Sequence, residues 1–332
     1  MNNQIEDIKT IEELVDYCEN QGEEHLFSVN KEKSLEVLSG YFNREISIRK
    51  YTGIRKIFGI VIKMEIIRKK CAKRDAEITY KRLSSDAREK YSKECINDLI
   101  VNKDNYLKAY ELLDEDAKHT YLDILKFRIT GDYKWINRAI SGNNQYFSNK
   151  IKWRDSENVV DCGAFIGDTL LAFINNGIRC SNYYLYELED DNYKQLLDSC
   201  EIAKKHGICV YPKKKGVYNK TGELYFKADK DSSTIVDYKT DTSIPVVKLD
   251  DEINGEVSFI KMDIEGSECE ALAGAQELIK KNKPTLAICI YHKQEDFWKI
   301  PLLIHEICPE YKNYWVEHYT MDYIESVLFV TV

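Results

Sequence analysis

The sequence predicts a doubly wound α/β fold that follows a helical N-terminal region. From residue 157 to residue 307, short apolar segments alternate with segments of helical periodicity, a pattern typical of a mostly parallel sheet. A loop with two glycines follows the first apolar segment. The last two apolar segments have no helix between them, so we expect antiparallel strands there. The chain of 332 residues is long enough for one such domain and a smaller accessory region.

The N-terminal half is expected to be helical. Residues 1 to about 150 contain no proline, and their apolar residues recur at helical spacing, as at Ile8 and Ile11. We predict that residues 1–110 form a helical accessory region. Residues 111–332 would then form the α/β domain, which includes a helical lead-in.

One segment of the helical half is strongly basic. From Arg44 to Arg82 there are thirteen Lys or Arg residues and four Asp or Glu residues, a net charge of +9 in a chain whose net charge is −8. Its apolar residues at helical spacing are Ile57, Ile60, Val61, Met64, Ile67 and Cys71. One interpretation is a helix with a solvated basic face. The others are a membrane-surface helix and an acceptor site for an anionic substrate.

The first predicted strand is a short apolar run after Glu157 that ends in Asp161. The glycine loop with Gly163 and Gly167 follows it. A helical pattern begins at Asp168. Because glycine has no Cβ, such a loop can turn sharply and let a ligand approach closely. The first amides of the helix are available to an anionic group of that ligand.

The second predicted strand, over residues 182–186, ends at Glu187. An acidic residue at this strand end, about twenty residues beyond the glycine loop, is placed to accept hydrogen bonds from ribose hydroxyls. The alternative is a solvated loop carboxylate beside Glu189, Asp190 and Asp191. The combination of loop and strand end favours a nucleoside-binding site.

The remaining predicted elements continue the alternation and place three polar residues at strand ends. Asp263 follows one buried strand, and His292 and Lys293 follow the next. Ser267 is expected to cap the helix between these strands. The elements are a helix over 191–203, strands over 208–211, 223–226, 244–247, 257–262 and 285–291, helices over 267–281 and 298–307, and final strands over 314–318 and 326–332.

Three segments resemble a known family. Residues 159–169 resemble motif I of the class I S-adenosylmethionine-dependent methyltransferases. Residues 286–293 resemble the FkbM family within that class, and so does the segment 259–268 with Leu272, Gly274 and Ala275 after it. The resemblance covers roughly residues 120–332, so it identifies the α/β domain as FkbM-like.

The resemblance implies a fold, a cofactor and a set of ligand contacts. The sheet should have seven strands in the order 3-2-1-4-5-7-6, and the cofactor should be S-adenosylmethionine. Glu187 would bind the ribose, and the loop backbone would hold the methionyl part. Asp161 would orient the loop and meet the amino group, directly or through water. The implied cofactor-binding residues are Asp161, Gly163, Ala164, Gly167, Thr169, Glu187 and Asp263.

Methyl transfer to a hydroxyl requires aligned reactants and a group that removes the acceptor proton. His292 is the preferred general base because the ordinary pKa of histidine lies near neutrality. Asp263 is the second candidate, or it positions the acceptor. The competing interpretation of His292 is a structural histidine at a strand end.

Three further residues are expected on the acceptor side as substrate-binding groups: Lys261, Glu265 and Lys293. Lys261 lies within a buried strand, so its ammonium needs a partner, and Glu265 is the candidate. Asp263 and Glu265 have no evident third acidic ligand beside them, so we expect no metal site.

These observations predict an S-adenosylmethionine-dependent O-methyltransferase that acts on a hydroxyl of a sugar, glycan or secondary metabolite. One alternative is a nicotinamide-dependent Rossmann dehydrogenase. The spacing of Gly163 and Gly167 disfavours it, because it is not Gly-x-Gly-x-x-Gly. The other alternative is a nucleoside-binding scaffold without catalysis, which the acidic residues at three strand ends disfavour.

Composition indicates the setting of the protein. The net charge of −8 argues against a general nucleic-acid-binding protein. The ten cysteines form no Cys-x-x-Cys motif, so we expect reduced thiols in a cytoplasmic protein. The polar N-terminus is not expected to be a signal peptide, and no membrane insertion is expected. A homo-oligomer is compatible with the sequence.

Overall fold

The computed structural model describes residues 5–21, 30–51, 72–82, 84–229, 232–236, 240 and 242–332. The chain divides into two compact units. One contains residues 1–142 and 316–326, and the other contains residues 143–315 and 327–332. The expected domain boundary between residues 110 and 111 stays a prediction.

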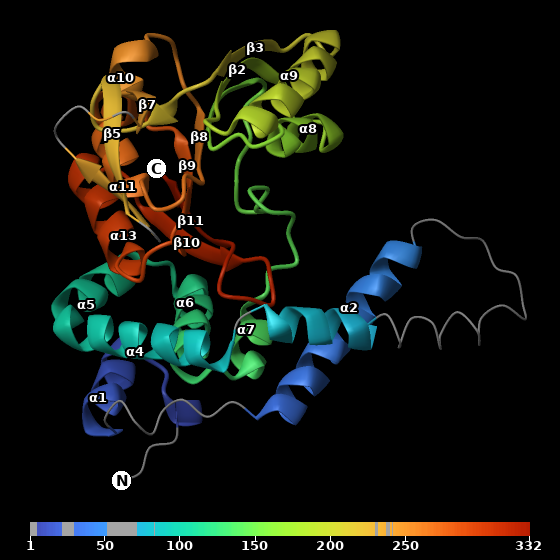
Figure 1. Ribbon diagram of the computed structural model, residues 1–332, viewed down its shortest axis with the longest axis vertical. Helices are drawn as coiled ribbons and strands as arrows, with labels where there is room; N and C mark the ends of the chain where they lie inside the picture. The colour runs from blue at the N-terminus through green and yellow to red at the C-terminus, as the bar shows by residue number, and fades with distance from the viewer. Residues whose placement is uncertain are drawn as a thin grey trace, which may run out of the picture. The chain divides into compact units, whose positions relative to one another are not determined.

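The described N-terminal residues are helical, as the apolar periodicity predicts. The helices are η1 (Ile5–Asp7), α1 (Ile11–Gln21), α2 (Lys31–Tyr51), a helix over 72–81, α4 (Ser85–Val101), α5 (Lys103–Leu112), α6 (Glu115–Thr130) and α7 (Tyr133–Ala139) (Figure 1). Ser84 caps α4, because its hydroxyl accepts a hydrogen bond from the amide of Ala87. The positive φ of Gly131 ends α6.

Most of the basic segment, including the apolar residues from Ile57 to Cys71, lies outside the described residues. Its three interpretations therefore stay open. Within the part of the chain that the structure describes, no helix has the length and apolar character needed to cross a bilayer.

The second unit is built on the seven-stranded sheet that the resemblance implies. Its strands are β1 (Glu157–Cys162), β2 (Cys180–Tyr186), β3 (Cys209–Lys213), β8 (Phe259–Met262), β9 (Thr285–Cys289), β10 (Asn313–His318) and β11 (Ser326–Thr331). They lie in the order β10-β11-β9-β8-β1-β2-β3. When the seven strands are numbered along the chain and the sheet is followed from β3 to β10, this is the expected order 3-2-1-4-5-7-6.

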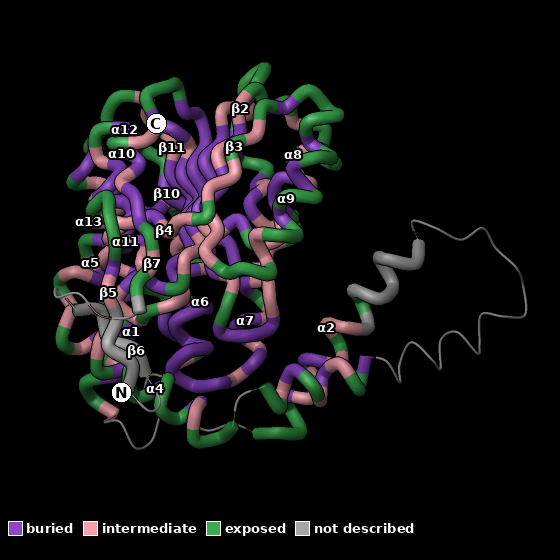
Figure 2. The backbone as a smooth tube through the Cα atoms, turned by 45° about the horizontal axis from the view of Figure 1, so that its top comes forward, coloured by how far each residue is buried: buried purple, intermediate pink, exposed green. Residues whose placement is uncertain are grey.

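Strand directions also agree with the prediction. Strands β3, β2, β1, β8 and β9 are parallel to one another, and β11 is antiparallel to β9. The amide of Lys312 bonds to Thr331 and that of Tyr319 to Glu325, so β10 and β11 form an antiparallel pair. Strands β8, β9 and β11 are buried along almost their whole length, and the buried centre of the sheet is visible in Figure 2.

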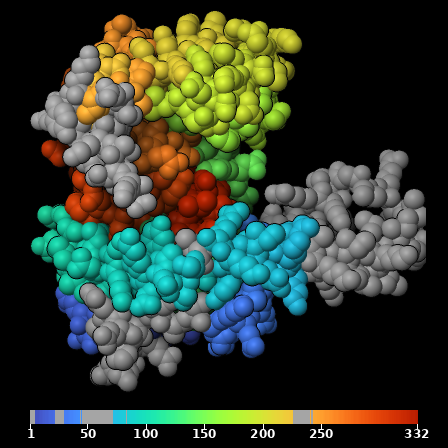
Figure 3. Space-filling view, in the orientation of Figure 1, coloured from blue at the N-terminus to red at the C-terminus, as the bar shows by residue number. Residues whose placement is uncertain are grey.

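Helices cover both faces of this sheet. On one side lie α8 (Asp168–Asn175) and α9 (Asp190–Lys205), and on the other lie α10 (Leu249–Glu252), α11 (Glu268–Ala273) and α13 (Asp296–Ile307) (Figure 1). A short helix α12 (Gln276–Asn282) follows α11. The outer face of α9 forms part of the molecular surface (Figure 3).

A second sheet, which the sequence did not predict, lies between β3 and β8 in the chain. It contains β4 (Gly216–Val217), β5 (Gly222–Asp229), β6 (Ser232–Val236) and β7 (Thr242–Val247) in the order β4-β7-β5-β6. The predicted strands over 223–226 and 244–247 are confirmed, but they pair with each other here and not in the main sheet.

The expected single helix over 267–281 is wrong, because the chain breaks at Gly274 into α11 and α12. A Cβ at Gly274 would lie 2.1 Å from the carbonyl oxygen of Tyr218. The close packing of this backbone on the chain after β4 therefore requires glycine. Ser267 occupies the N-cap position of α11, but its side chain makes no capping hydrogen bond, so the expected cap is wrong too.

Replacing Gly274 by alanine should destabilise the protein by about 1–3 kcal/mol, the usual cost of overpacking a close contact. The added methyl group meets a backbone carbonyl, which cannot rotate away as a side chain can. Urea denaturation would measure the loss. Gly142→Ala is the matched control, because a Cβ there meets no atom within 4 Å. Equal stabilities for the two variants would contradict the prediction.

Candidate active site

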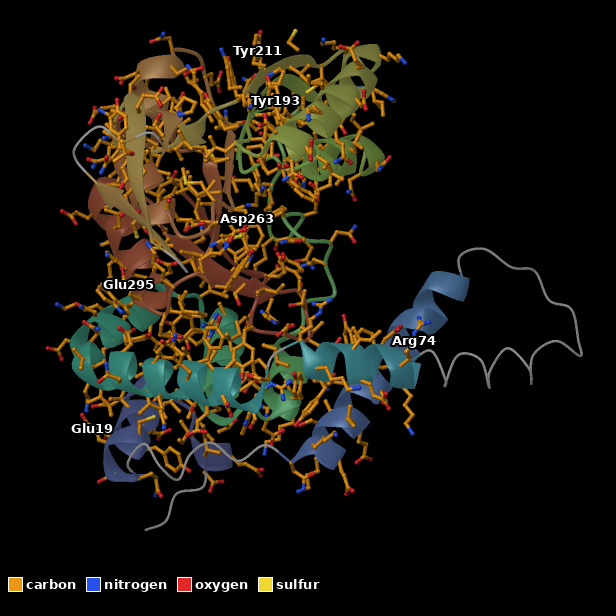
Figure 4. The ribbon with its side chains drawn as sticks, in the orientation of Figure 1. Glu19, Arg74, Tyr193, Tyr211, Asp263 and Glu295 are labelled. Atoms are coloured by element: carbon orange, nitrogen blue, oxygen red, sulfur yellow. The ribbon has the colours of Figure 1, made fainter. Side chains whose placement is uncertain are left out.

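The candidate site lies where four neighbouring parallel strands end. The order β2-β1-β8-β9 is continuous within the sheet, so the carboxyl ends of these strands share one edge. Glu187 follows β2, the glycine loop follows β1, Asp263 follows β8 and His292 follows β9. Figure 4 shows Asp263 projecting from the end of β8.

The glycine loop is shaped by contacts within the chain. Gly163 and Gly167 have φ of +78° and +81°, a conformation that favours glycine. A Cβ at Gly163 would lie 1.9 Å from the carbonyl oxygen of Asp263, and one at Gly167 would lie 2.7 Å from Cβ of Ser199. The protein's own packing therefore requires both glycines. The expected close approach of a ligand is not needed to explain them.

Most backbone amides of this loop already donate hydrogen bonds within the protein. Those of Gly163 and Ala164 both donate to the carbonyl of Tyr186, and that of Gly167 donates to Ala164. A methionyl group held here would therefore contact loop carbonyls or the first amides of α8, which lack partners within the helix. Thr169 is buried in that first helical turn.

Glu187 links the loop to the end of β2. One carboxylate oxygen accepts from the amide of Phe165 at 2.8 Å, and the other accepts from the amide of Glu189 at 2.7 Å. The side chain is half-buried. Each carboxylate oxygen can accept more than one hydrogen bond, so Glu187 retains capacity for ribose hydroxyls.

Lys261 and Asp161 form a buried ion pair beneath the loop. They face each other in the register of β1 and β8, and Nζ of Lys261 lies 3.0 Å from Oδ1 of Asp161. The same ammonium donates to the carbonyl of Gly163 at 2.5 Å. The expected partner of Lys261, Glu265, is therefore wrong. Lys261 is buried and paired here, and its expected contact with a substrate stays a prediction.

This pair fixes the loop to the sheet. Burial raises the pKa of Asp161 to about 6, although the charge and hydrogen bond of Lys261 lower it. The hydroxyl of Tyr183 also reaches the carboxylate, at 3.4 Å. Asp161 has no exposed surface, so its expected direct contact with an amino group would need a rearrangement. Its expected role in orienting the loop agrees with this geometry.

Asp263 accepts hydrogen bonds from two tyrosines. Oδ2 accepts from the hydroxyl of Tyr146 at 2.9 Å, and Oδ1 accepts from that of Tyr291 at 3.0 Å. Oδ1 also lies 3.5 Å from Nε2 of His292. The predicted proximity of Asp263 and His292 is thus confirmed.

His292 is surrounded by carboxylates. Nδ1 lies 2.9 Å from Oε1 of Glu268, and Nε2 lies 3.6 Å from Oε2 of Glu265. Burial lowers the pKa of the imidazole, but Glu268, and then Asp263 and Glu265, raise it more, so the pKa lies above its ordinary value. The side chain is only 9% exposed, and Nε2 is buried beside Asp263 and Glu265 with no hydrogen-bond partner among the described residues. The role of His292 as a base stays a prediction.

The two other residues expected on the acceptor side lie at the surface. The carboxylate of Glu265 is 92% exposed, and its backbone has a φ of +54°. Lys293 is exposed, and its side chain lies against Gly266. Within the described chain, no three His, Cys, Asp or Glu side chains are grouped to hold a metal ion.

Sequence reasoning missed three residues of this cluster. Tyr291 precedes His292 at a strand end, which is a usable signal. Glu268 follows Asp263 by five residues, but in the sequence it shows only an acidic residue in the first turn of a helix. Tyr146 has no signal in the sequence, because the lead-in brings it to Asp263 over a separation of 117 residues.

Most residues of the described site lie within a segment that matches a known family. A family model described as the methyltransferase FkbM domain matches residues 161–324. These residues form a methyltransferase FkbM domain. The FkbM domain contains Asp161, Glu187, Asp263 and His292, so the resemblance seen in the sequence is confirmed.

A solved structure supports the assignment. Methyltransferase FkbM from Methylobacillus flagellatus KT is 26% identical, with a TM-score of 0.63 over 72% of this chain and 62% of that chain. The present chain therefore spans less than two thirds of that relative. Fibrillarin from Aeropyrum pernix, solved with natively bound S-adenosyl-L-methionine, is 9% identical over 55% of this chain and 70% of that chain. Its TM-score of 0.36 is too low to support an argument. No curated protein matches the sequence significantly.

Proposed function

We propose that this protein transfers the methyl group of S-adenosylmethionine to a hydroxyl oxygen of a sugar, glycan or secondary metabolite. The observation that carries the proposal is the cluster of Asp263, His292 and Glu265 at the ends of β8 and β9. It lies beside strand ends that present Glu187 and the glycine loop. The methyltransferase FkbM domain supports a methyl-transfer reaction.

The residues present fit the proposed donor. Glu187 has spare acceptor capacity for two ribose hydroxyls, and the carbonyls of the loop suit an ammonium group. The acidic groups at the strand ends would also attract the positive sulfonium. S-adenosylmethionine would supply the methyl group, and the protein would supply alignment and a proton acceptor.

His292 and Asp263 would serve the acceptor. Nε2 of His292 faces Asp263 and Glu265, so an acceptor hydroxyl placed there could donate its proton to Nε2. The tyrosine hydroxyls that bond to Asp263 hold its carboxylate in one orientation. Because Nε2 of His292 lies near the carboxylates of Asp263 and Glu265, a neutral hydroxyl acceptor suits this site better than an anionic one.

Calorimetric titration with S-adenosylmethionine and with NAD, followed by a labelled methyl-transfer assay on sugars and glycans, tests the proposal. We expect the protein to bind S-adenosylmethionine and not NAD. We also expect the labelled methyl group to be transferred to a hydroxyl oxygen of the acceptor. Binding of NAD with no binding of S-adenosylmethionine would favour the dehydrogenase. Tight binding of S-adenosylmethionine without transfer to any acceptor would favour the scaffold.

Replacing Glu187 by alanine should weaken S-adenosylmethionine binding by about 1–3 kcal/mol, the usual loss for a hydrogen bond to a charged group. The loop would also lose its bond from the amide of Phe165. Calorimetry measures the change. Asp191→Ala removes a carboxylate that is 78% exposed at the start of α9, and it should leave the affinity unchanged. An unchanged dissociation constant for Glu187→Ala would exclude the ribose role.

A further inference from the structure

Glu268 is a fully buried carboxylate in the first turn of α11. Its Oε1 accepts a hydrogen bond from the amide of Ile264 at 2.9 Å and lies 2.9 Å from Nδ1 of His292. Its Oε2 is buried and has no hydrogen-bond partner among the described residues. A surface position would suffice for a favourable charge at a helix start. Complete burial therefore needs another explanation.

Burial of a carboxylate is costly unless a charged or polar partner compensates it. His292 is the basic side chain in contact with Glu268. The contact also fixes two segments to each other, because the loop from Asp263 to Gly266 bonds to Glu268 through Ile264. Gly266 packs directly on His292 and Lys293, with 3.6 Å from its ideal Cβ position to Cβ of His292. One carboxylate thus holds both sides of the site.

We propose that Glu268 is the positioning residue for His292, which it holds through Nδ1 so that Nε2 faces the acceptor. This inference rests on the proposed function, because it assigns His292 the role of general base. An imidazole held by a carboxylate at Nδ1 keeps its neutral-form proton on that nitrogen. Nε2 then carries the lone pair that accepts a proton.

The acceptor oxygen forms a bond to the methyl carbon, and the carbon–sulfur bond breaks with its electron pair remaining on sulfur. The acceptor proton passes to Nε2 of His292, which becomes an imidazolium. The negative charge of Glu268 at Nδ1 stabilises that imidazolium, and Glu268 itself does not need to take up a proton.

Several charged and titratable groups face His292. Glu268 approaches from α11, Asp263 and Glu265 from the loop after β8, and the ring of Tyr291 from its own segment at a centroid distance of 4.1 Å. Asp296 of α13 also interacts with it, and burial raises the pKa of Asp296 to about 7. The backbone amide of Lys293 donates to Asp296. Of these groups, Glu268 makes the shortest ion-pair contact with the imidazole.

Nuclear magnetic resonance titration of the imidazole tests the inference without any need for activity. The chain has six histidines, so the resonance of His292 can be assigned by its loss in His292→Gln. Glu268→Gln keeps an oxygen for the amide of Ile264 but removes the charge. We expect the pKa of His292 to fall in this variant, because the imidazolium loses the negative charge beside Nδ1.

Kinetics on the full chain supply the second measurement. In the parent, the single-turnover rate should rise with pH through the raised pKa of His292 and then level off. In Glu268→Gln, the inflection should move to lower pH, and the plateau rate should fall by about 10- to 100-fold, part of the 10²–10⁴ that a general base contributes. The affinity for S-adenosylmethionine should not change.

Two further variants complete the design. Glu270→Gln removes the same charge from the same helix, and its carboxylate acts on Tyr218, whose pKa is raised by burial and then by Glu270. It should leave both the inflection and the rate unchanged. Glu268→Asp keeps the charge but shortens the side chain, so the pKa of His292 should stay raised while the rate falls. This variant also tests the inference if Glu268→Gln does not fold.

The outcomes separate this inference from the proposed function. An unchanged pKa of His292 in Glu268→Gln would overturn the positioning role, whatever the protein methylates. A shifted pKa with a plateau rate within a few-fold of the parent would overturn it too, because His292 would then not be the base that Glu268 serves. If the parent protein did not bind S-adenosylmethionine, that result would instead count against the proposed function.

Discussion

Replacing His292 by alanine is expected to lower the rate of methyl transfer by about 10²–10⁴, the contribution of a positioned general base. The reason is the place of Nε2, which lies 3.5 Å from Asp263 at the ends of β8 and β9. His292→Gln keeps a polar side chain but has no base, so it should be nearly as slow. Cofactor affinity should change little, because Glu187 lies at the end of a different strand.

Single-turnover kinetics with saturating S-adenosylmethionine provide the measurement. His206→Ala is the matched control, because His206 is exposed at the end of α9, and its rate should equal that of the parent. The parent rate should rise with pH, since the raised pKa of His292 keeps the imidazole protonated at lower pH. Rates within a few-fold of the parent for both His292 variants would transfer the proton-accepting role to Asp263.

The second large effect is expected for Lys261→Met, which should destabilise the protein by about 3–5 kcal/mol, the usual loss when one partner of a buried pair is removed. Asp161 would keep a carboxylate with no exposed surface and no ammonium beside it. Lys204→Met is the control, because its ion pair with Glu201 is exposed and should contribute little to stability.

The loss in Lys261→Met should depend on pH. Burial already raises the folded-state pKa of Asp161 to about 6, and removal of Lys261 should raise it further. A carboxyl whose pKa is higher in the folded state favours folding when the pH is below its pKa in the unfolded state. This contribution to stability is lost as the pH rises through the pKa of the folded state. Urea denaturation should therefore show a larger difference from the parent at pH 8 than at pH 5.

Asp161→Asn combined with Lys261→Met should recover most of the stability. If Lys261→Met alone were as stable as the parent, a structural role for the pair would be refuted.

The sequence by itself determined the order of elements in the α/β domain and the place of most site residues. Apolar periodicity is a local property, so it located β1, β2, β8 and β9 with errors of only a few residues. Parallel strands align their carboxyl ends, so residues that follow them share an edge. For this reason the proximity of Asp263 and His292 could be predicted without a structure.

Tertiary structure alone decided which groups meet across that edge. Lys261 pairs with Asp161 and not with Glu265, because the register of β1 and β8 sets the two residues opposite each other. Local spacing along the chain carries no information about register.

Two further features depended on close packing between distant segments. The need for glycine at position 274 arises from the carbonyl of Tyr218, in a segment 56 residues earlier in the chain. The contact of Glu268 with His292 arises from the packing of α11 against the loop after β9. The strand and helix patterns follow from each segment's own sequence, whereas these contacts depend on how the folded chain brings separate segments together.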